Sequence, residues 1–244
     1  MNFSKMEGLG NDFIVFEGSV EVDAELVRKL CDRHFGIGAD GVLRVGQEGD
    51  FIRMDYWNAD GGMAEMCGNG LRCVALYAYD NALVENKSFV VKTAVGDRRV
   101  EIGDLISVEL GPVTMGEPRD WNGMTFHAVS VGNPHLVTLG KDPRKIDVAS
   151  IGKALELATP GGTNVGFGSV VGSGINLRVW ERGVGETLAC GSGMVAAAAL
   201  AHRLQLTGPA MAIKVPGGHA IVEIEDTTTW LTGPARLVFR GGLP

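Results

Sequence analysis

The sequence predicts an α+β fold of two pseudo-symmetric lobes, each a curved, mainly antiparallel sheet wrapped around a central helix. Three observations predict it. Landmark residues recur about half a chain apart, the order of predicted elements repeats with them, and each half contains one helix that is apolar nearly all round. We expect an N-terminal lobe at residues 1–114, completed by 234–244, and a C-terminal lobe at residues 115–233.

The landmarks recur at a nearly constant distance along the chain. Four pairs of residues share offsets of 122 to 124 positions: Asn11 with Asn133, Asp23 with Asp147, Asn58 with Glu181, and Cys67 with Cys190. An offset near half the chain length indicates that one structural unit occurs twice.

The predicted elements follow the same order in both halves. Residue patterns indicate short strands around a Gly-Asn turn, a helix with an aspartate N-cap, an alternating strand, and an apolar helix behind a Cys-Gly-x-Gly turn. In the first half we expect these elements at residues 5–8, 12–18, 23–30, 51–57 and after Cys67. In the second half we expect them at residues 126–132, 135–140, 147–157, 175–181 and after Cys190.

The last helix of each half has to be covered on every side. Its apolar runs are residues 73–79 in the first half and 194–204 in the second, and a curved sheet can enclose such a helix. Further strands are expected after each of these helices. The glycine-containing stretch 111–118 predicts a link between the lobes, and the strand 235–242 is expected to return to the first lobe.

Composition and charge favour a small-molecule partner. The 244 residues are 45% hydrophobic and 21% charged, which is typical of a soluble globular protein. The net charge is −7 and lysine and arginine form no cluster, so we expect neither a nucleic acid nor an anionic membrane surface as partner. The chain shows no signal-peptide pattern and no apolar run of about 20 residues, which predicts a cytoplasmic location.

The four cysteines are too few and too scattered for a disulfide framework or a zinc site. Reduced thiols and no bound metal are therefore expected. Cys31 lies on a helix face and Cys73 lies inside a helix, and we interpret both as small buried apolar residues.

The two repeated cysteines stand in front of helix starts, in MCGNG at 66–70 and ACGSG at 189–193. A helix N-terminus offers unpaired N–H groups and a positive dipole end, which bind an anion and lower the pKa of a nearby thiol. If Cys67 and Cys190 face a shared cleft, one thiolate can remove the α-proton of an amino acid while the opposite thiol returns one, with inversion. This scheme requires no pyridoxal phosphate. A redox pair of the same two cysteines is the competing interpretation.

Polar residues accompany the thiols. Asn11 and Asn133 follow glycine in turns, where asparagine serves the backbone as readily as a substrate. The adjacent Glu181 and Arg182 can recognise an ammonium and a carboxylate, and His135, beside Asn133, is placed to tune the pKa of a cysteine.

The chain resembles the diaminopimelate epimerase family along nearly its whole length, through FSKMEGLGNDFIV, RHFGIGADG, WNADG, MCGNGLRC, VGNPH, TNVGF and VWERGVGETLACGSG. The resemblance implies a cofactor-independent isomerase that interconverts LL- and meso-2,6-diaminopimelate for lysine and peptidoglycan precursor synthesis, and a homodimer. It implies catalytic thiols at Cys67 and Cys190, with His135 and Glu181 tuning their pKa. The implied substrate contacts are Asn11, Asn58, Gly68, Asn69, Asn133, Asn164, Glu181, Arg182, Gly191 and Ser192.

Two positions depart from the family's pattern and bear on fine specificity. Glu7 stands where many members have histidine, and Gly41 stands where some have a glutamine that contacts substrate.

The sequence is also compatible with four other functions. Proline racemases and hydroxyproline epimerases share the two-thiol mechanism, but their first cysteine loop has histidine where this chain has Asn69. A racemase for another amino acid, such as histidine, would keep the same scaffold. A non-catalytic carboxylate binder and a thiol redox sensor belong to different functional classes.

Overall fold

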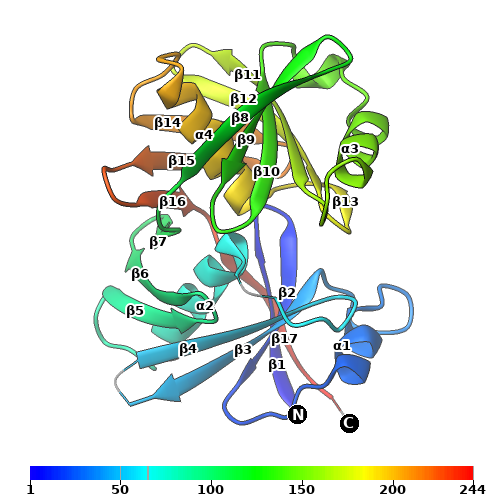
Figure 1. Cartoon of the computed structure of the whole chain (residues 1–244). Coiled ribbons are helices and arrows are strands. Elements are labelled where there is room, and N and C mark those ends of the chain that lie inside the picture. The colour runs from blue at the N-terminus through cyan, green and yellow to red at the C-terminus, as the bar shows by residue number, and fades with distance from the viewer. Residues whose placement is uncertain (50, 65, 244) are drawn as a thin grey trace. The chain divides into compact units, whose positions relative to one another are not determined.

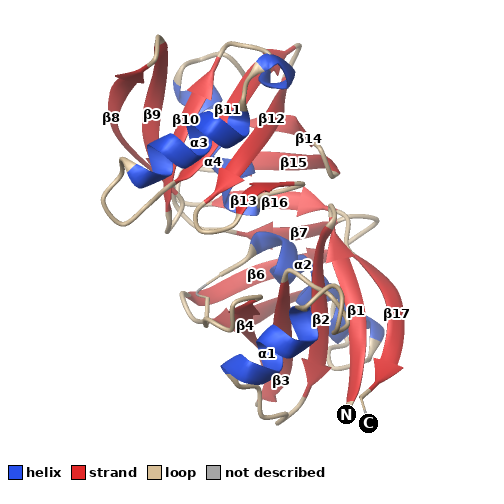
Figure 2. Cartoon of the chain, turned by 90° about the vertical axis from the view of Figure 1, so that its right-hand side faces the viewer, coloured by secondary structure: helices blue, strands red, loops and turns tan. Residues whose placement is uncertain are grey.

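The computed structural model describes residues 1–49, 51–64 and 66–243, and the chain separates into two compact units (Figure 1). The first unit consists of residues 1–108 together with 233–244, and the second consists of residues 109–232. Figure 2 shows α1 and α2 among the strands of the first unit and α3 and α4 among those of the second. The predicted α+β class is confirmed.

The first unit is built on one mixed sheet. Its strands, in spatial order, are β17 (Arg236–Gly242), β1 (Asn2–Gly8), β2 (Asn11–Glu17), β3 (Gly41–Glu48), β4 (Phe51–Asn58), β5 (Ser88–Thr93), β6 (Gly96–Ile102) and β7 (Ile106–Glu109). The β2/β3 and β4/β5 pairs are parallel, and the others are antiparallel.

The second unit repeats this arrangement. Its strands, in spatial order, are β8 (Thr114–Trp121), β9 (Met124–Ser130), β10 (Pro134–Leu139), β11 (Asn164–Val171), β12 (Gly174–Glu181), β14 (Ala210–Val215), β15 (Gly218–Ile224) and β16 (Thr229–Gly233). Here β10/β11 and β12/β14 are the parallel pairs. The short β13 (Gly185–Thr187) adds to β12.

The two sequences of parallel and antiparallel pairs match strand for strand. The position that β8 occupies beside β9 is filled in the first unit by β17, which pairs with β1. The C-terminal strand therefore completes the first unit. The matching topology extends the repeat from landmark residues to the whole fold.

One helix in each unit is enclosed by the sheet. Helix α2 (Gly68–Asp80) packs against β1, β2, β3, β4 and β6, and α4 (Gly191–Arg203) packs against β9, β10, β11, β12, β14 and β15. Ten of the thirteen residues of α4 are buried. These are the two helices that the apolar runs behind Cys67 and Cys190 predict.

The other two helices are amphipathic and have the predicted caps. Helix α1 (Ala24–Cys31) begins after Asp23, whose Oδ1 accepts a hydrogen bond from the Leu26 N–H at 2.8 Å. Helix α3 (Val148–Leu157) begins after Asp147, whose Oδ1 accepts from the Ser150 N–H at 3.1 Å. Each cap satisfies an N–H that the helix itself leaves unpaired.

The prediction of a link at residues 111–118 is wrong for most of that stretch. Thr114–Trp121 form β8, which pairs with β9 and belongs to the second unit. The pairing register shifts between Met115 and Pro118, so Gly116 and Pro118 lie at an irregularity of the strand. Glycine and proline are typical of such irregular strand positions as well as of links.

No helix among the described residues is long and apolar enough to cross a membrane.

Candidate active site

Cys67 is the N-cap residue of α2. Its backbone is extended, with φ −143° and ψ 114°, and its Sγ accepts a hydrogen bond from the Gly70 N–H at 3.4 Å. A sulfur in this position lies at the positive end of the helix dipole, where a thiolate is stabilised.

The glycine after the cysteine turn brings the helix start close to the sheet. A methyl group on Gly70 would lie 3.2 Å from Leu43 Cδ2 and 3.4 Å from Cys67 Cβ. Gly68 and Asn69, the first two residues of α2, are buried. The Cys-Gly-x-Gly spacing thus serves packing as well as any contact with a ligand.

Asn11 lies beside the Cys67 thiol. It is the first residue of β2, after a turn in which Leu9 and Gly10 both have positive φ (58° and 81°). Its Oδ1 accepts hydrogen bonds from the Cys67 Sγ at 3.5 Å and from the Asn69 Nδ2 at 3.2 Å. The structure therefore brings together three of the predicted residues of this unit at the N-terminus of α2.

Asn58 ends β4, opposite Gly41 in the β3/β4 pair, and its backbone N–H donates to the Gly62 carbonyl at 2.9 Å. A methyl group on Gly41 would lie 2.4 Å from the Trp57 carbonyl oxygen. A larger residue at position 41 therefore requires a different course of β4 at this point.

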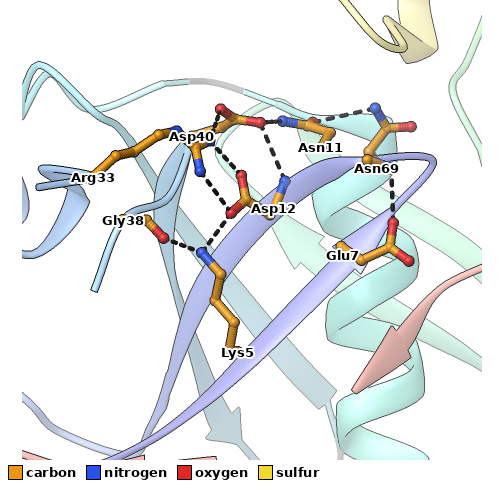
Figure 3. Close-up of polar contacts among 9 residues, drawn as sticks. Lys5, Glu7, Asn11, Asp12, Arg33, Gly38, Asp40 and Asn69 are labelled. Atoms are coloured by element: carbon orange, nitrogen blue, oxygen red, sulfur yellow. Dashed lines mark hydrogen bonds and ion pairs between the residues drawn. The ribbon is translucent and has the colours of Figure 1, made fainter. Parts of the chain in front are cut away.

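Glu7 joins the β1/β2 turn to β17. Its Oε2 accepts a hydrogen bond from the Gly10 N–H at 2.8 Å, and its Oε1 accepts from the Arg236 Nε. Figure 3 shows the Glu7 carboxylate hydrogen-bonded to the β1/β2 turn. This residue thus has a structural role next to the site.

A charged cluster of Lys5, Asp12, Arg33 and Asp40, which the sequence did not predict, lies next to Asn11 and is hydrogen-bonded to it through Asp40 (Figure 3). Lys5 Nζ lies 2.6 Å from Asp12 Oδ2, and the Arg33 guanidinium bridges Asp12 and Asp40 with its closest contact to each at 2.7 Å. Asp40 in turn accepts a hydrogen bond from Asn11 Nδ2 at 2.7 Å. The RHFGIGADG stretch therefore contributes Arg33 and Asp40 to this cluster.

In the second unit, Cys190 is the N-cap residue of α4. Its backbone is extended, with φ −118° and ψ 113°, and the residue is buried. A methyl group on Gly193 would lie 3.0 Å from Val179 Cγ2 and 3.3 Å from Cys190 Sγ, so a larger residue is crowded here as at Gly70. Gly191, the first residue of α4, is also buried.

Ser192, His135 and Asn133 form a hydrogen-bonded group beside Cys190. The Ser192 Oγ lies 3.7 Å from Cys190 Sγ and 3.0 Å from His135 Nε2, and it accepts from Asn133 Nδ2 at 3.2 Å. His135 Nε2 also lies 3.1 Å from Asn133 Oδ1. His135 therefore reaches the thiol through the Ser192 hydroxyl.

The imidazole of His135 is neutral. Burial lowers its pKa to about 3, and the positive charge of Arg182 lowers it in the same direction. Because Asn133 Oδ1 can only accept, the network assigns the ring proton to Nε2. His135 Nδ1 is buried and has no hydrogen-bond partner among the described residues.

Glu181 acts on the Cys190 thiol. Burial raises the pKa of Cys190 well above its ordinary value, and the charge and hydrogen bond of the Glu181 carboxylate raise it further. Glu181 Oε1 also accepts from Thr187 Oγ1 at 2.5 Å, which links β12 to β13. Without a ligand, Cys190 is therefore a thiol.

Asn164 and Arg182 lie where β11 begins and β12 ends, and they are hydrogen-bonded there. Asn164 pairs with His135 across β10 and β11, and its Oδ1 accepts from the Arg182 backbone N–H at 3.0 Å. The Arg182 guanidinium is exposed and donates to the Gly161 carbonyl at 3.2 Å.

The remaining two cysteines are buried, as predicted. Burial raises the pKa of Cys31 to about 11 and raises the pKa of Cys73 as well. Both are protonated at neutral pH, which suits packing and not proton transfer. Within the described ranges, no group of three or more His, Cys, Asp and Glu side chains is placed to hold a metal ion.

A buried arginine was also missed by the sequence analysis. Arg72 is fully buried on α2; its Nη2 donates to Asn69 Oδ1 at 2.9 Å and its Nε donates to the Pro234 carbonyl at 3.1 Å. The sequence could have indicated a buried arginine here, because Arg72 is a charged residue within an otherwise apolar run of the helix.

The sequence matches one protein family along nearly its whole length. The sequence model of the family described as "Diaminopimelate epimerase" matches residues 3–119 and 127–238. A diaminopimelate epimerase of Leptospira biflexa is 37% identical over 99% of this chain and 98% of its own length. One from Caldanaerobacter subterraneus is 40% identical over the same shares of the two chains.

Solved structures share the fold at low sequence identity. A predicted epimerase from Pseudomonas aeruginosa superposes with a TM-score of 0.77 at 15% identity, covering 99% of this chain and 98% of that one. A probable proline racemase from Agrobacterium radiobacter, with bound carbonate, gives a TM-score of 0.76 at 15% identity, covering 100% and 92%.

Proposed function

Because the chain belongs to the diaminopimelate epimerase family, we propose that it interconverts LL- and meso-2,6-diaminopimelate by proton transfer between the thiols of Cys67 and Cys190. The enzyme class is an isomerase.

One observation carries the mechanism: each unit places a cysteine at the N-cap of its enclosed helix, at the same point of a repeated topology. A single catalytic thiol would not need this duplication. Two thiols at equivalent places suit a reaction in which a base and an acid exchange roles between forward and reverse directions.

In the proposed step, a thiolate takes the α-proton and the C–H electron pair remains on the α-carbon. The α-carboxylate shares this developing charge, and N–H groups at a helix start stabilise it. The opposite thiol then delivers its proton to the other face, so one thiol and one thiolate are present before and after the reaction. The chemistry requires both sulfurs to reach the same carbon.

The raised pKa of Cys190 favours Cys190 as the acid and Cys67 as the base in the ligand-free state. Cys190 holds the proton there, and Glu181 maintains this state. Cys67, whose sulfur accepts the Gly70 N–H, is then the thiol from which the base is formed. In the reverse direction the roles exchange.

The polar residues around the thiols are our proposed substrate contacts. They share positions at the helix starts and at the neighbouring strand ends: Asn11, Asn58, Gly68, Asn69, Asn133, Asn164, Glu181, Arg182, Gly191 and Ser192. Arg182 is suited to a carboxylate because a guanidinium binds carboxylates in bidentate fashion.

The direct test is proton NMR of the reduced protein with LL-diaminopimelate in heavy water. We expect loss of the α-proton signal together with appearance of the meso isomer, and neither in Cys67→Ala or Cys190→Ala. No exchange in the wild-type protein would contradict the substrate assignment. The same assay with histidine and proline then distinguishes a changed substrate from an inactive binder, in which ligand binding would survive both alanine substitutions.

We also propose that the partner of the chain is a second copy of itself. On β17, Leu237, Val238 and Phe239 are 39, 51 and 46% exposed, which is unfavourable for a strand surface in water. Sedimentation equilibrium should give the dimer mass for the wild-type protein and the monomer mass for Val238→Lys. A monomeric wild-type protein would contradict the proposal.

A further inference from the structure

Two side-chain amides in the first unit lie in series between a guanidinium and a carboxylate. Arg72 Nη2 donates to Asn69 Oδ1 at 2.9 Å, and Asn69 Nδ2 donates to Asn11 Oδ1 at 3.2 Å. Asn11 Nδ2 donates to Asp40 Oδ2 at 2.7 Å (Figure 3). We call these four residues the amide chain.

The two ends give the amide chain one direction. A carboxamide taken alone has two orientations that differ only in which side presents oxygen and which presents nitrogen. A guanidinium can only donate and an ionised carboxylate can only accept. With Arg72 at one end and Asp40 at the other, every amide oxygen has to face Arg72 and every amide nitrogen has to face Asp40.

The ends are themselves held in place. Asp40 accepts from Arg33 Nη2 at 2.7 Å and from the Asp12 backbone N–H at 3.2 Å. Arg72 is fully buried and bonded to Pro234, and a methyl group on Gly8 would lie 3.1 Å from its Nη2. Arg72 forms no ion pair with a carboxylate among the described residues, so its contact with Asn69 accounts for a large part of its polar interactions.

We propose that Asp40 and Arg72 are positioning residues that fix the direction of the amide chain, so that Asn11 presents its oxygen, and not its NH₂ group, to the Cys67 thiol. This proposal rests on the acid–base role proposed for Cys67.

The direction matters because the Asn11 oxygen lies 3.5 Å from Cys67 Sγ. A thiol donates its S–H to that oxygen, whereas a thiolate faces it with repulsion. A reversed amide would present N–H groups and favour the thiolate. Asp40 and Arg72 thus bias Cys67 toward the protonated form, the form in which it acts as the acid in the reverse direction, and they oppose the contribution of the Gly70 N–H.

The test measures the thiol pKa of Cys67 without substrate. In a Cys190→Ser background, the pKa follows from the pH dependence of alkylation by iodoacetamide and of thiolate absorbance. Asp40→Asn can donate as well as accept, so only the contact with Asn69 still holds Asn11 in its direction and the reversed amide becomes accessible. We expect the pKa of Cys67 to fall by about one unit, a tenfold rise in thiolate at a given pH.

The matched control is Asp12→Asn. It removes one negative charge from the same cluster, but the Asp12 side chain contacts Lys5 and Arg33 and not the amide chain. We expect it to leave the pKa of Cys67 within a few tenths of the wild-type value. Equal shifts in both variants would show a charge effect alone and would overturn the proposal, as would no shift in Asp40→Asn.

A measurement on protein with an unchanged amide chain covers the case in which Asp40→Asn does not fold. In ¹⁵N-labelled protein, the side-chain amide protons of Asn11, assigned by their loss in Asn11→Asp, should show nuclear Overhauser contacts to the Arg33 side chain. Contacts to the Cys67 β-protons in their place would mean that the amide is reversed, and the proposal would fail. Neither experiment depends on turnover. A failure of the proposed epimerase activity in the exchange assay can therefore be told apart from a failure of this proposal.

Discussion

The hydroxyl oxygen of Ser192 lies 3.7 Å from the sulfur of Cys190. The same oxygen accepts from Asn133 Nδ2 at 3.2 Å and lies 3.0 Å from His135 Nε2, which carries the ring proton. With its acceptor sites occupied, the hydroxyl has its own proton left for Cys190. This donor opposes the effects of burial and of Glu181 on the thiol.

Ser192→Ala should therefore raise the pKa of Cys190 further. A hydrogen bond contributes about 1 kcal/mol and one pKa unit corresponds to about 1.4 kcal/mol, so we expect a rise of about half a unit to one unit. The measurement is the alkylation rate of Cys190 against pH in a Cys67→Ser background. Ser192→Thr keeps the hydroxyl and should stay near the parent value; an equal rise in both variants would contradict this role for the hydroxyl.

His135 should make the protein less stable as the pH falls below neutrality. Its pKa is about 3 in the folded protein against 6.5 when exposed, so the unfolded chain binds more protons between these values. The free energy of unfolding then decreases with falling pH, by about 1.4 kcal/mol per unit and about 2 kcal/mol from pH 6.5 to pH 5. Urea unfolding of His135→Gln should show a shallower decrease over this range; parallel curves for the two proteins would refute the assignment.

The helix starts could be predicted from the sequence because their signals are local. Asp23 and Asp147 cap helices whose first hydrogen bonds lie three residues away, and Cys67 and Cys190 stand next to the glycines that shape their turns. The repeat then implied the same sheet around both helices without any knowledge of strand pairing.

The amide chain could not be predicted, since its members come together only through the fold. Asn11 and Asp40 are 29 residues apart, and Asn11 and Asn69 are 58 residues apart. Nothing in a stretch such as GADG indicates which amide it will face. The prediction of a link at residues 111–118 was wrong for a different reason. Gly116 and Pro118 fit an irregular strand as well as a link.

Gly193→Ala should destabilise the second unit and disturb its thiol. The added methyl group would lie 3.0 Å from Val179 Cγ2 and 3.3 Å from Cys190 Sγ, and both residues are buried and cannot move away freely. Overpacking of this kind costs about 1–3 kcal/mol, which exceeds the gain of about 1 kcal/mol in helix propensity. Gly208→Ala, with no atom within 4 Å of the added methyl group, is the control. Equal free energies of unfolding in the two variants would contradict the packing argument.

Lys5→Met should cost far more than the loss of an ordinary surface lysine. Lys5 Nζ lies 2.6 Å from Asp12 Oδ2, and the two side chains are only 8 and 17% exposed, so removing the cation leaves a largely buried carboxylate. Arg33 keeps two hydrogen bonds to Asp12, at 2.7 and 3.2 Å, although its own side chain is 55% exposed, so part of the carboxylate charge stays compensated. Breaking a buried pair costs about 3–5 kcal/mol when its partner is left unpaired, so with Arg33 still in place we expect Lys5→Met to cost less than this. Lys92→Met, a third exposed and 3.6 Å from Glu48, should cost less than about 1 kcal/mol. In urea unfolding, adding Asp12→Asn to Lys5→Met should recover part of the loss, because the uncompensated charge is then gone; strictly additive losses would mean that the two side chains are not coupled.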